Sequence, residues 1–128
     1  MTTREDAGAG DRRCRVGRLG EGHAATLLES RGCVVLDRNW RSREGEIDLV
    51  VVDPQGGLRF VEVRTRTGTG FGTPAESVTP AKRARVRTVA RAWLAEHRRG
   101  WPRIEFDVVG VDLSDASRPR LELFEGVF

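Results

Sequence analysis

Two stretches of alternating residues, separated by a short segment rich in Pro and Gly, constrain the fold of this chain more than any other feature. Alternation with many β-branched residues is typical of strands, and Pro with Gly between such strands is typical of a hairpin turn. The sequence therefore predicts a β-hairpin. Its strands are EIDLVVV (46–52) and LRFVEVRTR (58–66), and its turn is DPQGG (53–57).

A five-residue turn fixes which residues of the predicted hairpin face each other. Antiparallel pairing places Val52 opposite Leu58, Asp48 opposite Glu62 and Glu46 opposite Arg64. Opposed residues have Cβ atoms roughly 5 Å apart, so Asp48 and Glu62 repel each other unless a cation lies between them. Mg²⁺ prefers such carboxylates together with waters and phosphate oxygens. The alternative is that both acids are solvated surface charges paired with nearby arginines.

The remaining sequence predicts the order α-β-β-β-α-β-β, an α/β mixed sheet with helices packed against it. The first helix is expected over about 17–31, with Leu19, His23, Leu27 and Leu28 on its apolar face. The second helix is expected from Pro80 to about residue 98, with Thr79 as its N-cap. The other strands are expected at 33–41, 103–113 and 120–128.

The composition favours one soluble domain. With 128 residues, we expect a flexible polar lead-in at 1–15 and one domain at 16–128. The basic residues are 21 Arg and a single Lys, and the guanidinium of arginine can donate two hydrogen bonds to one phosphate group. Cys14 and Cys33 have no metal-ligand spacing, so we interpret them as reduced thiols of a cytoplasmic protein. No stretch approaches the ~20 apolar residues of a membrane span, so we expect no membrane partner.

Four segments of the chain are specific in order and spacing: GRLGEGHAATLLESRGCVVLDRNWRSREGEIDLV, FVEVRTR, FGTPAESVTPAKRARV and IEFDVVGV. Together they resemble the YraN family, whose members are predicted endonucleases distantly similar to archaeal Holliday junction resolvases. The resemblance implies a restriction-endonuclease-like, PD-(D/E)XK fold and Mg²⁺- or Mn²⁺-dependent hydrolysis of phosphodiester bonds in structured or branched DNA. It implies that Asp48 and Glu62 are the two metal-binding acids and that Glu21 is a third. The analogy with resolvases also suggests a homodimer.

One residue departs from the nuclease pattern, because Arg64 stands where that motif has lysine. Guanidinium can neutralise charge on a phosphate but is a poor general base. Lys82, on the stripe of the second helix that continues with Val86 and Val89, is expected to point towards the sheet and reach the site. The alternative is a solvated surface lysine.

Several arginines are candidates for phosphate contacts, and the alternative is that they form ordinary solvated surfaces. A Gly-rich loop, TGTGFG (67–72), could also follow a nucleic-acid backbone. Two functions remain open: a metal-dependent endonuclease, or a nucleic-acid-binding module that kept the fold and lost the chemistry. Nothing in the sequence separates DNA from RNA. The candidate arginines are Arg41, Arg43, Arg66, Arg83, Arg87 and Arg91.

Overall fold

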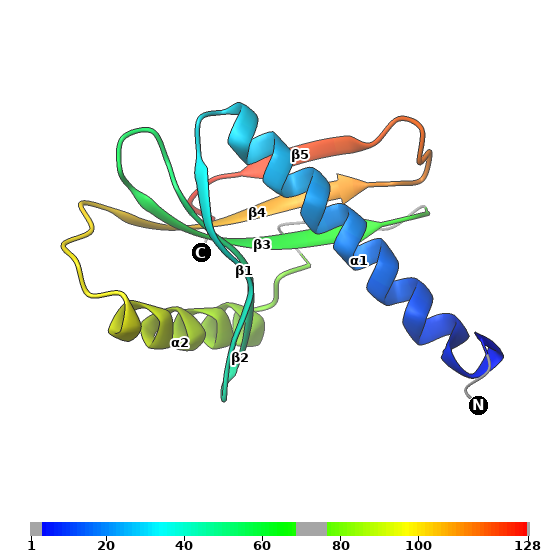
Figure 1. Cartoon of the computed structure of the whole chain (residues 1–128), viewed down its shortest axis with the longest axis horizontal. Coiled ribbons are helices and arrows are strands. Elements are labelled where there is room, and N and C mark those ends of the chain that lie inside the picture. The colour runs from blue at the N-terminus through cyan, green and yellow to red at the C-terminus, as the bar shows by residue number, and fades with distance from the viewer. Residues whose placement is uncertain (1–3, 69–76, 128) are drawn as a thin grey trace.

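The computed structural model describes residues 4–68 and 77–127, with side chains described from residue 12 onwards. The predicted order of elements is confirmed (Figure 1). The loop 67–72 lies mostly outside the described residues. The elements are α1 (Arg4–Ser30), β1 (Val34–Ser42), β2 (Gly45–Val52), β3 (Leu58–Arg66), α2 (Pro80–Glu96), β4 (Ile104–Asp112) and β5 (Arg120–Phe124).

The five strands form one mixed sheet in the order β1-β2-β3-β4-β5, which confirms the predicted α/β class. Only β3 and β4 are parallel. A parallel pair needs a long crossover connection, and α2 lies in it. The turn at 53–57 gives the predicted register at the start of the hairpin, with Val52 opposite Leu58.

The two helices cover opposite faces of the sheet. Neighbouring residues of a strand point to opposite faces. Phe60 packs in a cluster with Trp93 of α2, whereas Val61 packs in a cluster with Leu28 of α1. The site therefore has a helix available on each side of the strands that carry its acids.

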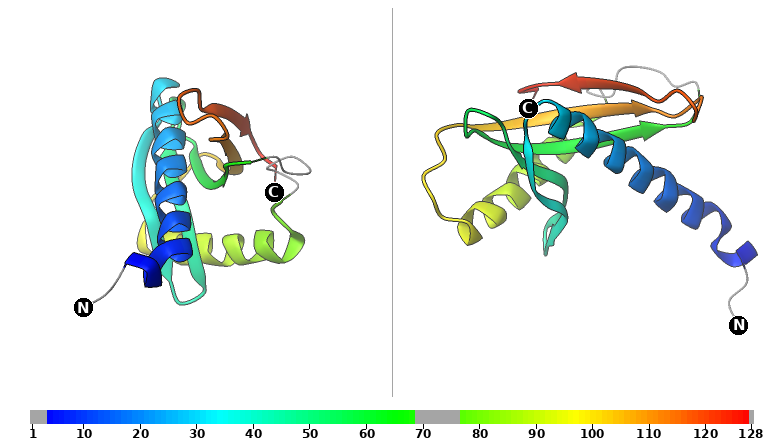
Figure 2. Two further views of the ribbon diagram at one scale, coloured as in Figure 1. Left: turned by 90° about the vertical axis from the view of Figure 1, so that its right-hand side faces the viewer. Right: turned by 45° about the horizontal axis from the view of Figure 1, so that its top comes forward.

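α1 differs from the prediction in its length and in its buried face. It begins at Arg4, well before the expected start at Gly17, and its N-terminal part extends past the edge of the sheet (Figure 2). Leu19 was expected on the apolar face but is 58% exposed. The buried stripe contains Gly20, Ala24 and Leu28 at four-residue spacing, so Leu19 lies one residue outside it.

Gly20 sets how closely α1 approaches the sheet. A Cβ atom at this position would lie 2.9 Å from the Cβ of Thr65 in β3, which is closer than two side chains can pack. Only glycine allows this approach without a shift of the helix. The next residue along α1 is Glu21, so the close contact also brings an acid to β3.

The predicted start of α2 is confirmed. The Thr79 side chain accepts a hydrogen bond from the backbone N–H of Lys82 at 3.2 Å, and Pro80 follows as the first helical residue. The helix ends at Glu96 instead of about residue 98, with His97 as its C-cap. Trp93 is fully buried, and its Nε1 donates to Asp37 of β1 at 2.7 Å.

A network of charged residues around two buried acids, Asp53 and Asp107, lies near the 53–57 turn. Arg59 donates to Asp53 at 3.0 Å and to Asp107 of β4 at 3.0 Å. Arg103 donates to Asp53 at 2.9 Å. Burial alone would raise the pKa of Asp53, but hydrogen bonds from the Gly57 backbone and from both arginines hold that pKa below its ordinary value. These acids are already paired, so this network is structural.

Among the residues that the structure describes, no helix is both long and apolar enough to span a membrane.

Candidate functional site

The strands β2 and β3 separate where the predicted acids lie. The last residue pair of their ladder is Leu49 with Val61. Beyond it, the backbone N–H of Val63 donates to Oδ2 of Asp48 at 2.8 Å. A carboxylate thus accepts the hydrogen bond of a β3 amide just past the end of the ladder, and the strands open into a cleft.

The expected pairing of Glu46 with Arg64 is wrong. Glu46 accepts a hydrogen bond from Nε of Arg41 at 2.7 Å, and Arg64 donates to the backbone oxygen of Ser77 at 3.2 Å. The prediction assumed regular alternation along β2, which the strand does not keep. Ile47 packs with Val50 in the α2 cluster, although strict alternation would put them on opposite faces.

The cleft has a volume of about 450 Å³ and is bounded by residues of α1, β2, β3 and α2. It contains three predicted acids and three predicted cations. It also contains two arginines of α1 that the sequence analysis missed, because residues 1–15 were expected to be a flexible lead-in. The charged residues that line it are Arg12, Arg13, Glu21, Asp48, Glu62, Arg64, Arg66 and Lys82.

Glu62 is the most unusual of these residues. It is 3% exposed, and its Oε1 is buried without a hydrogen-bond partner. Burial, followed by the charge and hydrogen bond of Asp48, raises the pKa of Glu62 to about 9, against the opposing charges of Lys82 and Arg64. Without a further cation, burial and the neighbouring Asp48 favour the protonated form of this carboxyl group. A bound cation would replace that proton.

A second group of acids surrounds Asp48. Carboxylate oxygens of Glu21, Glu46 and Asp48 all lie within 4.8 Å of one another. Burial raises the pKa of Glu21, a hydrogen bond from Asn39 lowers it, and the charges of Asp48 and Glu46 raise it further. Three carboxyl groups this close together favour a positive ligand between them.

Asn39 of β1 holds two of these acids. Its Nδ2 donates to Oε1 of Glu21 at 3.0 Å and to Oε1 of Glu46 at 3.1 Å. Asn39 also has a φ of 50°, the left-handed region that Asn adopts more readily than most residues. Asn39 was not among the site residues predicted from the sequence. Its signal was an Asn inside a predicted strand, where this residue type is depleted.

The residues present fit a Mg²⁺ ion. Both oxygens of Glu46 already accept hydrogen bonds, Oε2 from Arg41 and Oε1 from Asn39. Hydrogen bonds of this kind orient metal-binding carboxylates, and the described acids whose oxygens converge are Glu21, Glu46 and Asp48. Glu62, which interacts with Asp48, adds an oxygen without a partner. Carboxylate oxygens are the ligands that Mg²⁺ and Mn²⁺ prefer.

Two cations of different elements line the cleft. Lys82 lines it from α2, and Arg64 lines it from β3. Nε of Arg64 is buried without a partner while its Nη2 is bound to Ser77. Arg66 also lines the cleft and donates to Asp112 at 3.4 Å.

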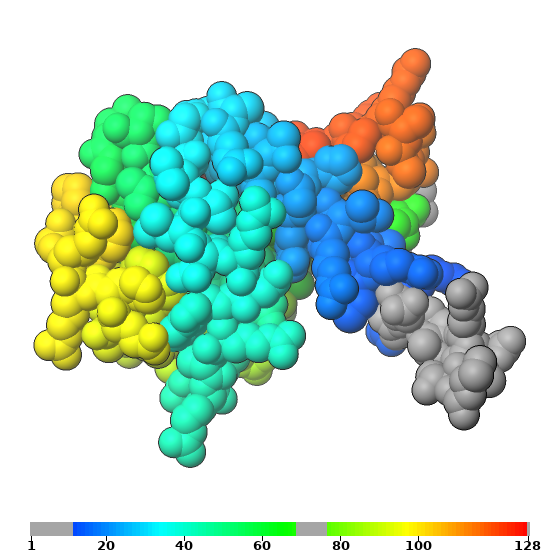
Figure 3. Space-filling model, in the orientation of Figure 1, coloured from blue at the N-terminus to red at the C-terminus, as the bar shows by residue number. Residues whose placement is uncertain are grey.

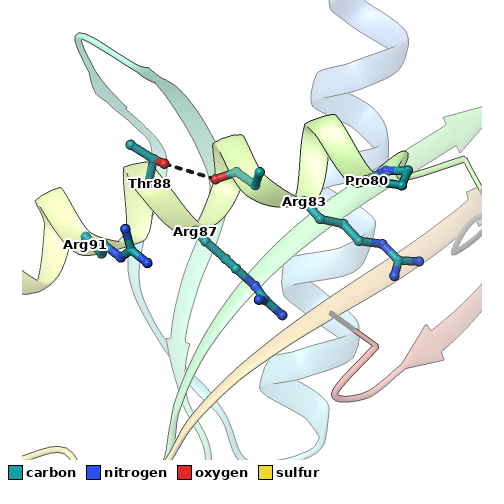
Figure 4. A pocket seen from close by; sticks show the side chains of 6 residues that line it. Pro80, Arg83, Arg87, Thr88 and Arg91 are labelled. Atoms are coloured by element: carbon teal, nitrogen blue, oxygen red, sulfur yellow. Dashed lines mark hydrogen bonds between the residues drawn. The ribbon is translucent and has the colours of Figure 1, made fainter.

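The other candidate arginines lie outside the cleft. Arg41 is bound to Glu46, and Arg43 is exposed in the β1–β2 turn, which projects from the body of the protein (Figure 3). Arg83, Arg87 and Arg91 line a separate groove on α2 (Figure 4).

Comparisons with known proteins give one consistent family. The sequence profile of the uncharacterised protein family UPF0102 matches residues 20–111. A UPF0102 protein of Nocardia farcinica is 47% identical over 122 residues, which cover 95% of this chain and 94% of the relative. A UPF0102 protein of Rhodococcus opacus is 45% identical over 113 residues, covering 88% and 95%. A UPF0102 protein of Mycolicibacterium gilvum is 46% identical over 118 residues, covering 91% and 96%.

Proposed function

The chain belongs to the UPF0102 (YraN) family, and from this premise we propose that it is a metal-dependent endonuclease acting on structured or branched DNA. The observation that carries the proposal is Glu62, a buried acid with an unpartnered oxygen that lies beside Asp48 in an open cleft lined with cations. The cations of the cleft would bind a polyanionic substrate, and its acids would bind a divalent ion. A cleft that combines the two supports phosphodiester hydrolysis.

Asp48, Glu62 and Glu21 would hold the metal. Mg²⁺ or Mn²⁺ bound there would polarise a phosphate oxygen and make water a better nucleophile at neutral pH. Asp48 is kept in position by the N–H of Val63, and Glu21 by the amide of Asn39. Acids positioned in this way do not need to reorganise when the ion binds.

Arg64 and Lys82 would act on the substrate phosphate. Arg64 stays protonated, so it can stabilise the charge that develops on the phosphate but cannot take a proton from water. Lys82 has a compact ammonium group, and it approaches the acids from α2, where the sequence offers no other lysine. The two cations would thus bind the scissile phosphate from two walls of the cleft.

A second candidate function is a nucleic-acid-binding module without catalysis. The observation that favours it is Arg64 itself, because a half-buried guanidinium, whose Nε is buried, occupies the position of the motif lysine. Metal binding separates the two candidates. A nuclease must bind Mn²⁺ through Asp48 and Glu62, whereas a binding module depends only on its basic residues.

The deciding experiment is cleavage of labelled branched, single-stranded and duplex DNA with Mg²⁺ or Mn²⁺. Wild type is compared with Asp48→Asn, which removes the charge and keeps the shape, and with Arg118→Gln as a surface control outside the cleft, in the turn before β5. We expect wild type and Arg118→Gln to cut and Asp48→Asn to lose at least about 100-fold in rate. If all three proteins bind DNA equally and none cuts, the binding module is the correct function.

A further inference from the structure

The acids at the cleft fall into two overlapping groups. Carboxylate oxygens of Glu21, Glu46 and Asp48 all lie within 4.8 Å of one another, and among the described residues Glu62 does not belong to this group. Glu62, on β3, interacts with Asp48 through its charge and a hydrogen bond. Asp48 therefore belongs both to a group of acids from α1 and β2 and to a pair formed with β3.

The size of a single ion limits how many of these acids it can bind. Mg²⁺ binds oxygens at about 2.1 Å, so two oxygens on the same ion are at most about 4.2 Å apart. The group of Glu21, Glu46 and Asp48 comes close to this limit, and Glu62 lies outside the group. Glu62 is 3% exposed, and close packing holds a side chain this buried in its position. Two ions that share Asp48 fit these positions better than one.

The oxygen of Glu62 that has no partner points to a ligand independently of the other acids. Oε1 of Glu62 is buried without a hydrogen bond, and Glu62 lines the cleft together with Asp48. A buried polar atom without a partner is unfavourable, and so is a second carboxylate beside it. A cation between Glu62 and Asp48 would remove both penalties. It would leave Glu21 and Glu46 without a cation of their own.

The hydrogen bonds of Glu46 leave it able to bind a metal ion. Each oxygen of a carboxylate has two lone pairs. Asn39 donates to Oε1 of Glu46 and Arg41 donates to Oε2, so one lone pair remains on each oxygen. Hydrogen bonds of this kind typically fix the orientation of carboxylates that bind metals. Glu46 is therefore a positioned carboxylate with acceptor capacity left.

The arginines near Glu21 and Glu46 compensate for little of the negative charge. Arg41 lies 2.7 Å from Glu46, and its side chain is 79% exposed. The charge of Arg18, also exposed, acts on Glu21. Water and salt screen exposed ion pairs, which contribute little to stability. A divalent ion between the converging oxygens would compensate for the repulsion directly.

We propose that the cleft binds two divalent cations that share Asp48, one between Asp48 and Glu62 and a second among Glu21, Glu46 and Asp48. This inference rests on the proposed function and makes it more specific. It assigns Glu46 as a metal ligand, and it divides Glu21 and Glu62 between two ions.

The test counts bound Mn²⁺ in the absence of nucleic acid. Free Mn²⁺ in solution gives sharp lines in electron paramagnetic resonance that broaden on binding, so a titration at neutral pH gives the number of bound ions. Frozen samples give a second readout. Two Mn²⁺ ions that share a carboxylate lie about 3.5–4 Å apart, and at this distance they couple magnetically and give a spectrum different from that of an isolated ion.

Three variants that each replace one acid with its amide are compared with wild type. Glu46→Gln removes a charged ligand of the second ion, and Glu62→Gln removes one of the first. Glu44→Gln is the matched control, because it removes the same charge from an exposed position two residues before Glu46, where Glu44 bonds with Ser42. Each change keeps the shape of the side chain, and thermal melts check the fold first.

We expect wild type and Glu44→Gln to bind two Mn²⁺ and to give the coupled spectrum. Glu46→Gln and Glu62→Gln should each bind one ion in the same concentration range, bind the other at least about tenfold more weakly, and lose the coupled spectrum. The proposal is overturned by one bound ion in wild type, by two ions without coupling, or by a coupled pair in Glu46→Gln. Equal losses in Glu44→Gln and Glu46→Gln would show a general charge effect and overturn it too.

The cleavage assay separates this inference from the proposed function. Wild type that binds two coupled ions but never cuts DNA would contradict the endonuclease alone. Wild type that cuts DNA while it binds a single ion would contradict the second ion alone.

Discussion

The carboxylate of Asp48 accepts a hydrogen bond from the backbone N–H of Val63 at 2.8 Å, just beyond the last pair of the β2–β3 ladder. The same side chain therefore has two tasks. It satisfies an amide that the separating strands would otherwise leave without a partner, and it supplies negative charge to the cleft. Substitutions that keep one task and remove the other can separate them.

We expect Asp48→Asn to retain nearly wild-type stability, because its side-chain oxygen still accepts from Val63. Asp48→Ala should lower the free energy of unfolding by about 1–3 kcal/mol, since it leaves the amide unsatisfied. Both variants should bind Mn²⁺ at least about tenfold more weakly, because a charged ligand is lost. Urea unfolding and Mn²⁺ titration measure the two effects. Equal stability of Asn and Ala variants would show that the hydrogen bond contributes nothing.

Glu62 should make the metal-free protein less stable as the pH rises. Its pKa in the folded protein, about 9, is above the ordinary value of 4.5, so its contribution is fully present below about pH 4.5 and is lost as the pH rises towards 9. Glu62→Gln cannot ionise. In EDTA, the stability of Glu62→Gln relative to wild type should therefore increase by up to about 1.4 kcal/mol for each pH unit in this window.

Thermal unfolding of both proteins across this pH range measures the effect. Titrating groups that do not interact with Glu62 are common to the two proteins and cancel in the difference. Added Mn²⁺ should raise the melting temperature of wild type more at pH 8 than at pH 6, because the ion displaces a proton. A difference between the proteins that does not change with pH would rule out a raised pKa.

Asn39 can be tested by comparing two substitutions. Asn39→Gly keeps the left-handed backbone without strain and removes the hydrogen bonds to Glu21 and Glu46. Asn39→Ala removes the same bonds and adds a strained φ, which costs roughly 1 kcal/mol or more. We expect Ala to be less stable than Gly in urea, and both to bind Mn²⁺ more weakly by a similar factor. Wild-type Mn²⁺ affinity in both variants would show that Asn39 does not position Glu21.

Two glycines of α1 should respond to alanine in opposite directions. Gly20→Ala places a Cβ 2.9 Å from the Cβ of Thr65, so α1 or β3 must move, at a cost of about 1–3 kcal/mol. A Cβ at Gly22 would meet nothing within 4 Å. Gly22→Ala should therefore stabilise the protein by about 0.5–1 kcal/mol through helix propensity alone. Circular dichroism melts compare the variants, and a stabilising Gly20→Ala would disprove the close approach.

Sequence patterns within short segments correctly predicted the hairpin turn and the start of α2. The five-residue turn gave the pairing of Val52 with Leu58, and Thr79 followed by Pro80 gave the start of α2. Each result depends on residues that are close in the sequence. The order of elements was also correct, because alternation and helical periodicity are strong signals over these lengths.

Features that depend on contacts between residues far apart in the sequence were not predicted. Leu19 was placed on the apolar face of α1, but the small residues Gly20 and Ala24 face the sheet because Thr65 lies so close. Glu46 was expected to face Arg64, and the irregular strands give it Arg41 instead. The role of Asn39 depends on contacts to residues 18 and 7 positions away. No single segment of the sequence contains that information.

The cleft also has a consequence for protein synthesis. Its charged residues lie between Arg12 and Lys82, so all of them are translated before β4. β3, which carries Glu62, pairs in parallel with β4, and that pairing forms only after residue 112 has left the ribosome. A nascent chain that stops before β4 therefore contains every charged residue that lines the cleft among the described residues, but lacks the parallel strand beside β3.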